Sequence, residues 1–198
     1  VTSRGKPHPA RAASRCILNI YEIPLPDPNA PVSAVYNVGI IQGGEVVNAI
    51  PQEVSFTVDL RTVDPVLLEQ LDTDIVSACA EAAQAESVEF HREIIQQSPA
   101  GGTPDQLADR REHPLVETAV DILKFLGHDF GSQPTARATG STDANAGVVR
   151  GLPAIAVGRA YGGNQHTLTE WSDIESARIG TKQIILLTAA LAELAAGA

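Results

Sequence analysis

The spacing of apolar residues along the chain predicts a succession of helices and strands. Apolar positions three and four residues apart, with Pro or Asp at several of the starting points, predict helices over residues 9–21, 64–82, 114–126 and 173–195. Strict alternation of apolar and polar residues predicts a half-buried strand over residues 54–61. Segments rich in apolar and β-branched residues predict further strands over residues 34–42, 88–94 and 153–157.

The order of elements in the first half predicts a ferredoxin-like domain. Residues 1–5 have the composition of the end of a strand, and the elements that follow are helix, strand, strand, helix and strand. This βαββαβ order is the split βαβ pattern, in which two helices cover one face of a four-stranded antiparallel sheet. A polar stretch with Pro and Gly over residues 98–112 marks a boundary. We therefore assign residues 1–98 to the first domain and residues 99–198 to the second.

Helices and strands alternate in the second half, which predicts a mostly parallel α/β layer. Within it, residues 140–143 form a polar turn before a short helix, and a glycine-rich loop follows the strand predicted at 153–157. Free backbone N–H groups at a helix start and loops after the strands of α/β sheets are both common places for ligands. Residues 138–171 are therefore the stretch on which we expect chemistry to depend.

Composition narrows the classes of protein that fit this fold. The 198 residues carry 24 acidic and 14 basic side chains, a net charge of −10, which argues against a surface for nucleic acid or anionic membrane. No apolar run is long enough to cross a bilayer and no signal peptide is visible, so we expect a cytoplasmic protein. Cys16 and Cys79 fall on the apolar faces of predicted helices, and we expect buried free thiols. The chain begins at Val1 and contains no Met, so we expect it to be a fragment.

Two groups of polar residues are candidates for chemistry. His166 lies close to Glu170 in the loop of the second domain, where an imidazole is a candidate metal ligand, although a lone loop histidine is more often a surface residue. Arg61 lies on the polar face of a strand, and its guanidinium fork can bind a carboxylate with help from the amide of Asn48. The alternative for Arg61 is a surface ion pair with Asp59.

Three motifs in the second half resemble the C-terminal signature of a zinc-dependent peptidase and deacylase family. They are GSTDA at residues 140–144, GLPA at residues 151–154 and HTLTEW at residues 166–171. The family includes carboxypeptidase G, acetylornithine deacetylase, succinyl-diaminopimelate desuccinylase, aminoacylase and peptidase T. The first half resembles the lid, or dimerisation, domain of carboxypeptidase G-like members through GGEVVNAIP at residues 43–51 and DLR at residues 59–61.

The resemblance implies a metal centre to which His166 contributes. This histidine would bind one of two zinc ions, with cobalt or manganese as alternative metals, and water bound by the metal would attack the scissile carbonyl. The other ligands of the family and its general base lie in an H-x-D motif, a Glu-Glu pair and further acidic residues. Neither H-x-D nor Glu-Glu occurs in this sequence. We therefore expect the chain to lack the N-terminal half of the enzyme and most of its metal ligands.

The resemblance also implies roles in binding substrate. Asn48 and Arg61 would hold the terminal carboxylate of the substrate, and the backbone of Gly140 and Ser141 would face its pocket. His8 would act as a catalytic residue from the lid of one subunit, reaching across a homodimer interface to stabilise the tetrahedral oxyanion in the partner's active site. The residue after His8 is Pro, where the family usually has Ser or Ala.

These observations predict the lid domain and the C-terminal part of the catalytic domain of a metal-dependent amidohydrolase. The substrate would be a small peptide or an N-acyl amino acid with a free carboxylate, and an N-carbamoyl amino acid hydrolase would use much the same residues. The alternative from a different class is a non-catalytic amino-acid-binding or dimerisation module. We expect a homodimer through the lid domain, with no nucleic acid or membrane as partner.

Overall fold

The computed structural model describes residues 5–30, 32–100, 109–128 and 142–196. Contacts within the chain divide it into two compact units, Val1–Gln97 and Ser98–Ala198, called here the first and second units. Each unit combines helices with a small antiparallel sheet, so the α+β class is confirmed. The strand expected at the start of the chain falls almost wholly outside the described residues.

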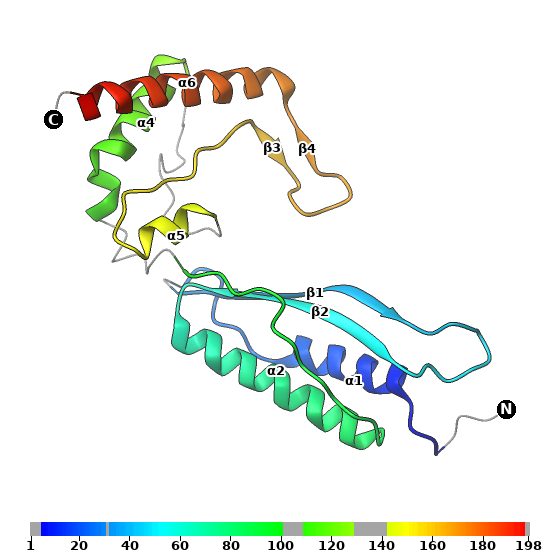
Figure 1. Ribbon diagram of the computed structural model, residues 1–198. Coiled ribbons are helices and arrows are strands. Elements are labelled where there is room, and N and C mark those ends of the chain that lie inside the picture. Colours follow the sequence, from blue (N-terminus) through cyan, green and yellow to red (C-terminus); the bar gives the residue numbers. More distant parts are fainter. Residues whose placement is uncertain (1–4, 31, 101–108, 129–141, 197–198) are drawn as a thin grey trace. The chain divides into compact units, whose positions relative to one another are not determined.

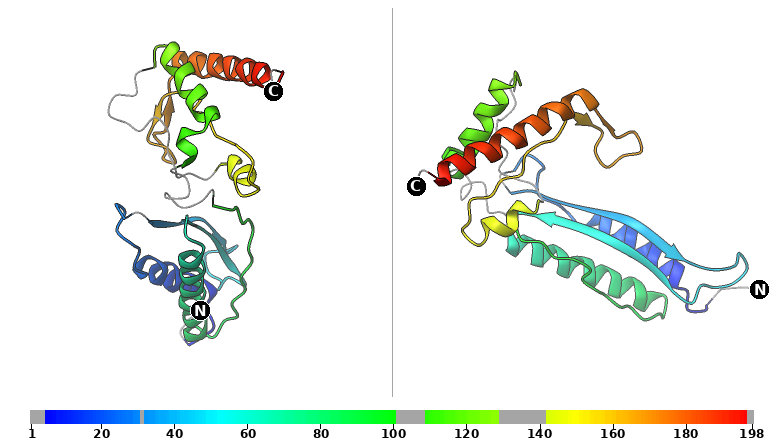
Figure 2. Two further views of the ribbon diagram at one scale, coloured as in Figure 1. Left: turned by 90° about the vertical axis from the view of Figure 1, so that its left-hand side faces the viewer. Right: turned by 45° about the horizontal axis from the view of Figure 1, so that its top comes forward.

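The first unit consists of two helices packed on one face of a two-stranded antiparallel sheet (Figure 1). Its elements are α1 (Pro9–Glu22), β1 (Ala34–Gly43), β2 (Val54–Thr62) and α2 (Pro65–Ala85). Proline at the first turn suits both helices, because the N–H that it lacks would have no partner within the helix. Both views in Figure 2 place the two helices on the same side of the sheet.

The register of the sheet decides which side chains reach the core. Val38 lies opposite Val58 and Val35 opposite Arg61, with an irregularity between Val38 and Ile41. Successive side chains of a strand point to opposite faces. One face therefore packs against the helices, and its partly buried apolar side chains are Tyr36, Val38, Phe56, Val58 and Leu60. The alternation over residues 54–61 predicted this face correctly.

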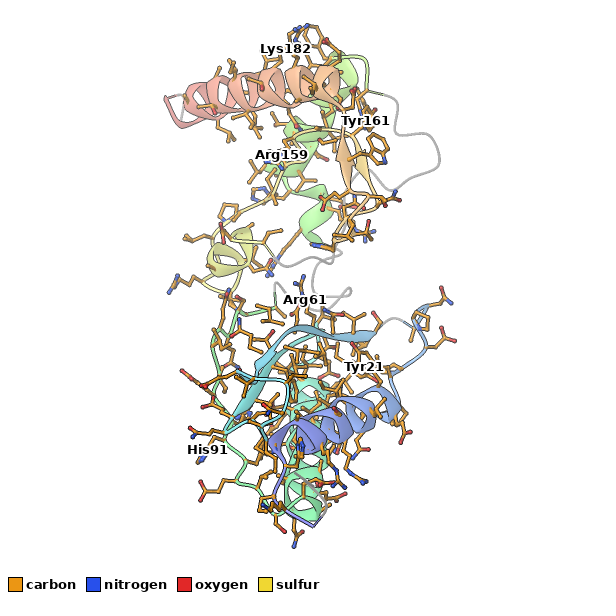
Figure 3. All side chains as sticks on the ribbon, turned by 90° about the vertical axis from the view of Figure 1, so that its right-hand side faces the viewer. Tyr21, Arg61, His91, Arg159, Tyr161 and Lys182 are labelled. Carbon is orange, nitrogen blue, oxygen red and sulfur yellow. A yellow bond between two sulfur atoms is a disulfide. The ribbon has the colours of Figure 1, made fainter. Side chains whose placement is uncertain are left out.

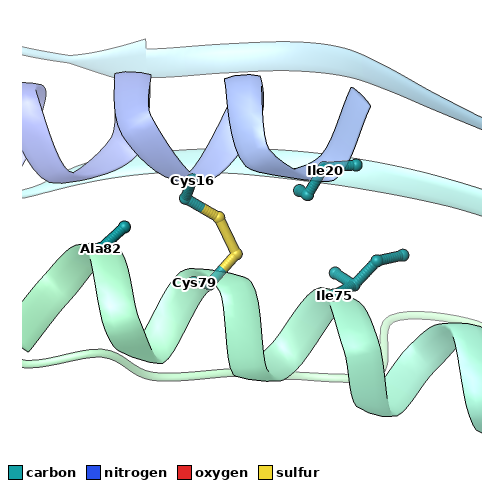
Figure 4. Packing of buried hydrophobic residues seen from close by; sticks show 5 residues of the cluster. All are labelled: Cys16, Ile20, Ile75, Cys79 and Ala82. Atoms are coloured by element: carbon teal, nitrogen blue, oxygen red, sulfur yellow. A yellow bond between two sulfur atoms is a disulfide. The ribbon is translucent and has the colours of Figure 1, made fainter. Parts of the chain in front are cut away.

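The centre of the first unit is a buried cluster between α1 and α2 (Figure 4). Its members are Cys16, Ile20, Ile75, Cys79 and Ala82. Cys16 and Cys79 are buried as expected, but a disulfide joins them and their Cα atoms lie 4.6 Å apart. The prediction of free thiols is wrong, because the apolar stripes of the two helices bring the cysteines face to face.

A buried carboxylate ties the end of α2 to α1. Glu86 follows the last residue of α2 and is only 6% exposed. Its Oε1 accepts a hydrogen bond of 2.9 Å from Nε of Arg15 and lies 3.1 Å from Nη2 of Arg11. A carboxylate withdrawn from water needs such partners. The two arginines therefore fix how the helices meet at this end of the unit.

The strand predicted over residues 88–94 is not formed. Residues 88–97 have no regular secondary structure, and Phe90 and Ile94 are exposed. An ion pair of 2.6 Å between Arg92 and Asp72 joins this segment to α2. A strand needs a neighbour for its backbone groups, and within the described part of this unit β1 and β2 pair only with each other. The described core is thus the central αββα part of the predicted ferredoxin-like order.

The second unit is built on two helices that contact each other. Its elements are the short 3₁₀ helix η1 (Asp109–Glu112), α4 (Pro114–Phe125), α5 (Ala144–Val148), β3 (Gly162–Gly163), β4 (Trp171–Ser172) and α6 (Ile174–Ala196). The predicted helices at 114–126 and 173–195 correspond to α4 and α6. Between them, the buried side chain of Gln183 donates to the carbonyl oxygen of Ala119 at 3.4 Å.

The strand predicted over residues 153–157 is not formed. Residues 152–159 have no regular secondary structure, and the one ladder in the described part of this unit is the antiparallel pair β3–β4. A strand needs a neighbour to pair its backbone groups, and Pro153 has no N–H to donate. The chain then passes very close to α6. A Cβ on Gly180 of this helix would collide with the carbonyl oxygen of Arg159.

No helix in the described ranges is long and apolar enough to span a membrane.

Candidate functional site

His166 lies in a short hairpin formed by β3, β4 and the loop of residues 164–170. Gly162 pairs with Ser172 and Gly163 pairs with Trp171. The indole of Trp171 lies directly over Gly163, where a Cβ would come within 2.7 Å of the indole Nε1. The two glycines of this stretch therefore allow the close strand pairing that closes the loop.

Tyr161 fastens the base of the hairpin to α6 (Figure 3). Its backbone N–H donates to Oγ of Ser176 at 2.8 Å, and its carbonyl oxygen accepts the N–H of Asp173 at 2.8 Å. The carboxylate of Asp173 in turn accepts the N–H of Ser176 at 2.7 Å, as an N-terminal cap does. The candidate loop thus projects from a base held by a long helix.

The loop itself is held by hydrogen bonds among its own residues. Thr167 donates to the carbonyl oxygen of Asn164 through its N–H at 3.1 Å and its hydroxyl at 2.7 Å. Glu170 donates its N–H to the carbonyl oxygen of Thr167 at 3.1 Å. The amide of Asn164 reaches the carbonyl oxygen of Thr169 at 3.4 Å. Local polar side chains therefore take the place of a longer strand pairing.

His166 adopts a backbone conformation that few residues other than glycine adopt. Its φ is +65°, and Asn164 nearby has φ +55°. Asn and His are among the residues that enter this region more often than others. The N–H of His166 donates to Oε2 of Glu170 at 3.1 Å, and the imidazole is exposed. The ring is thus presented to solvent from a tightly turned backbone.

The described residues do not by themselves form a metal centre. Within the described ranges, no three His, Cys, Asp or Glu side chains are grouped so that they could hold an ion. Zinc at a catalytic site takes three protein ligands as a rule. His166 offers one exposed donor nitrogen. A zinc centre that includes His166 therefore needs ligands beyond those described.

Gly140 and Ser141, the predicted substrate-facing positions, lie outside the described residues. The described end of the same motif leads into α5. Asp143 stands at the start of this helix, but its carboxylate accepts no capping hydrogen bond. Asn145 in α5 donates its side-chain N–H to the carbonyl oxygen of Pro99 at 3.2 Å.

Arg61 is paired with Asp59 on the exposed face of β2. Nε of Arg61 lies 2.8 Å and 3.0 Å from the two carboxylate oxygens, and Nη2 lies 2.6 Å from Oδ2. The hydrogen bond with Asp59, followed by its charge, holds the pKa of Arg61 above its usual value. The surface ion pair considered from the sequence is therefore present. A substrate carboxylate at Arg61 would compete with Asp59.

The structure does not bring Asn48 close to Arg61 within one chain. Asn48 is exposed in the loop between β1 and β2, whereas Arg61 lies near the far end of β2. The seven residue-to-residue steps of the strand from position 54 to position 61 span about 20 Å. The start of α1 lies at the same end of the unit as the loop (Figures 1 and 2). Asn48 and the N-terminus of α1 therefore share one end, and Arg61 lies at the other.

His8 occupies the N-cap position of α1. Its carbonyl oxygen accepts the N–H groups of Arg11 and Ala12 at 3.0 Å and 3.1 Å, while its side chain makes no capping bond. Nδ1 of His8 is buried and has no hydrogen-bond partner among the described residues. Buried polar atoms are nearly always paired. His8 thus has a free hydrogen-bonding group at the end of the unit that also carries Asn48.

Tyr161 and His128 form a contact that the sequence did not indicate. The Tyr161 hydroxyl lies 2.6 Å from Nδ1 of His128, and the two rings stack with centroids 5.3 Å apart. No motif surrounds His128 in the sequence. The two residues are 33 positions apart. No periodic pattern spans that distance, so the pair depends on how α4 and the hairpin fold together.

Residues 6–87 match the family model of the peptidase dimerisation domain. This segment runs from just before α1 to just after α2 and contains His8, Asn48 and Arg61. The match supports the resemblance of the first unit to the lid domain of the peptidase family. The second unit lies outside the matched segment. No curated protein matches the chain.

Proposed function

We propose that this chain is part of a metal-dependent amidohydrolase of the zinc-dependent peptidase and deacylase family. The observation that carries the proposal is the match of residues 6–87 to the peptidase dimerisation domain. The HTLTEW motif of the second unit adds to it, because the hairpin presents His166 to solvent. The proposed substrate is a small peptide or an N-acyl amino acid with a free carboxylate.

In this proposal the chain binds and orients the substrate and supplies one metal ligand. His166 is the proposed ligand, and zinc is the proposed metal, with cobalt and manganese as alternatives. The remaining ligands and the general base belong to a part of the enzyme beyond this sequence. Gly140 and Ser141 keep their proposed place at the substrate pocket. This division assigns the hydrolytic step to the complete protein.

The geometry of the first unit suggests how a homodimer would share the substrate contacts. One carboxylate group is too small to touch both Asn48 and Arg61 within one chain, since about 20 Å of strand separates them. We propose that Arg61 of one protomer and Asn48 of the other approach the same substrate. His8, at the end that carries Asn48, would then come from that second protomer.

The second candidate function is a dimerisation module without catalysis. The observation for it is that the family model matched by residues 6–87 is that of a dimerisation domain. An N-carbamoyl amino acid hydrolase would fit the same residues as a peptidase, and substrate assays separate the two. The presence or absence of H-x-D and Glu-Glu motifs in the complete reading frame separates enzyme from module.

The test uses the protein encoded by the complete reading frame, with His166→Ala beside a matched variant, His91→Ala. His91 is an exposed histidine on a segment without regular structure, away from the motifs. We expect His166→Ala to lose bound zinc and at least about 100-fold in kcat/KM on dipeptides or N-acyl amino acids. His91→Ala should retain both. Full activity and zinc content in His166→Ala would contradict the proposal.

The cytoplasm is the proposed location, on the sequence grounds given above. The bridge between Cys16 and Cys79 weighs against this location, because disulfides are rare in cytosolic proteins. Thiol trapping provides the test, and a reduced pair would support the cytoplasm. An oxidised pair in protein isolated directly from its cells under thiol-trapping conditions would contradict a cytoplasmic location.

A further inference from the structure

We propose that Glu170 is a positioning residue that holds the backbone of His166 in place. This inference rests on the proposed role of His166 as a ligand. A His and a Glu four residues apart could both be taken for ligands from the sequence alone. The hairpin shows which group the carboxylate contacts.

The carboxylate of Glu170 is bound to the backbone of the loop. Its Oε2 accepts the N–H of His166 at 3.1 Å. A hydrogen bond to a charged acceptor is stronger than one between neutral groups. The imidazole of His166 takes no part in the bonds that hold the described loop, so it is the group left to face a ligand.

The conformation of His166 explains why such a contact is needed. With φ at +65°, its backbone lies in a region that L-residues rarely adopt. Residues held in such conformations persist when the surrounding structure fixes them. Glu170 is well placed to do so, since the next residue, Trp171, is fixed by its pairing with Gly163. The paired strand thus fixes Glu170, and the carboxylate of Glu170 in turn holds the backbone of His166.

The experiment compares Glu170→Ala and Glu170→Gln in the metal-free chain by NMR. Glu170→Gln keeps an acceptor oxygen but loses the charge, whereas Glu170→Ala removes the acceptor. We expect the His166 amide proton to exchange with solvent about tenfold faster in Glu170→Ala, with Glu170→Gln close to wild type. The matched control is Glu175→Ala. Glu175 is an exposed carboxylate on α6 paired with Arg178 at 2.8 Å, so its loss should leave the His166 amide unchanged.

A titration with Zn²⁺ of the metal-free protein encoded by the complete reading frame, followed on the imidazole signals of His166, gives the second measurement. We expect Glu170→Ala to weaken this binding about tenfold, as loss of an orienting partner does, and Glu170→Gln to restore most of it. The thermal midpoint of each variant is recorded as well. A loss of zinc affinity with an unchanged midpoint supports positioning, while an equal loss in Glu175→Ala would overturn it.

The two measurements separate this inference from the proposed function. Unchanged exchange of the His166 amide in Glu170→Ala would overturn the positioning role whatever the zinc result. Faster exchange in Glu170→Ala with no shift of the His166 imidazole by Zn²⁺ in the wild type would support the backbone contact and contradict the ligand role of His166. A loss of Zn²⁺ binding in Glu170→Gln as complete as in Glu170→Ala would contradict a role through the acceptor oxygen.

Discussion

Tyr36 gives the first unit a defined response to alkaline pH. Burial, and next the neighbouring Tyr21, raise its pKa above the ordinary value of 10.0. Its hydroxyl donates to the carbonyl oxygen of Ile23 at 2.9 Å. The folded protein therefore holds this proton more tightly than the unfolded chain. The stabilisation is fully present below pH 10.0 and is lost as the pH rises through the folded-state pKa.

We expect a spectrophotometric titration at 295 nm to show one tyrosine that ionises later than the others, and Tyr36→Phe to remove it. Tyr21→Phe is the control, because it keeps Tyr36 and should leave the late component in place. The free energy of unfolding should fall less between pH 9 and pH 11 in Tyr36→Phe than in the wild type. A wild-type titration in which every tyrosine ionises together would contradict the assignment.

At the residue scale, contacts between near neighbours in sequence could be predicted, and distant ones could not. Asp59 and Arg61 are two residues apart on a strand, so their side chains share a face and the ion pair follows from the pattern. The disulfide between Cys16 and Cys79 and the contact of Tyr161 with His128 join residues far apart in the chain. Their formation depends on how whole elements pack, which apolar spacing alone does not specify.

At the scale of elements, the helices could be predicted because each one shows its own apolar stripe. The strands at 34–42 and 54–61 were equally clear. A glycine pair lies between them, and apolar and polar residues alternate strictly within the second strand. The strands predicted at 88–94 and 153–157 were wrong. Their apolar residues fitted the pattern, but a strand forms only beside another strand. A run of β-branched residues shows a tendency to form a strand, but it does not show that a neighbouring strand is present.

The fold of the second unit depends on the absence of a Cβ at Gly180. Alanine in a helix is usually favoured over glycine by about 1 kcal/mol. Here a Cβ would collide with the carbonyl oxygen of Arg159. We expect Gly180→Ala to lower the free energy of unfolding of this unit by about 3 kcal/mol, since the backbone must move to make room. Urea unfolding followed by the fluorescence of Trp171, the one tryptophan, measures it.

The matched control for this substitution is Gly158→Ala. Gly158 lies one residue before Arg159, and a Cβ there would meet nothing within 4 Å. We expect its midpoint in urea to stay close to that of the wild type. Equal stability of Gly180→Ala and Gly158→Ala would show that the approach of Arg159 to α6 is not a feature of the folded protein.

At the scale of the whole molecule, the proposal requires two copies of the chain. Residues 6–87 match a dimerisation domain, and β1 carries three exposed apolar side chains, Val35, Ile40 and Ile41. An exposed strand edge with apolar side chains is a ready template for pairing with another chain. We therefore expect sedimentation equilibrium to show a homodimer whose contact includes β1.

Ile41→Lys tests that contact without disturbing the core. Ile41 is 60% exposed in one chain, so a lysine there keeps its charge in water unless a second chain covers it. We expect the dissociation constant of the dimer to rise at least about tenfold, because charges on an edge strand oppose pairing. Leu168→Lys is the control, since Leu168 is fully exposed in the hairpin loop of the second unit, outside the matched domain.

A substrate site shared by two protomers also predicts how activity depends on protein concentration. The activity of Ile41→Lys should fall as the dimer dissociates, and it should recover at protein concentrations that restore the dimer. A wild-type monomer with full activity would contradict the proposed sharing of the substrate site by His8 and Asn48 of a second protomer.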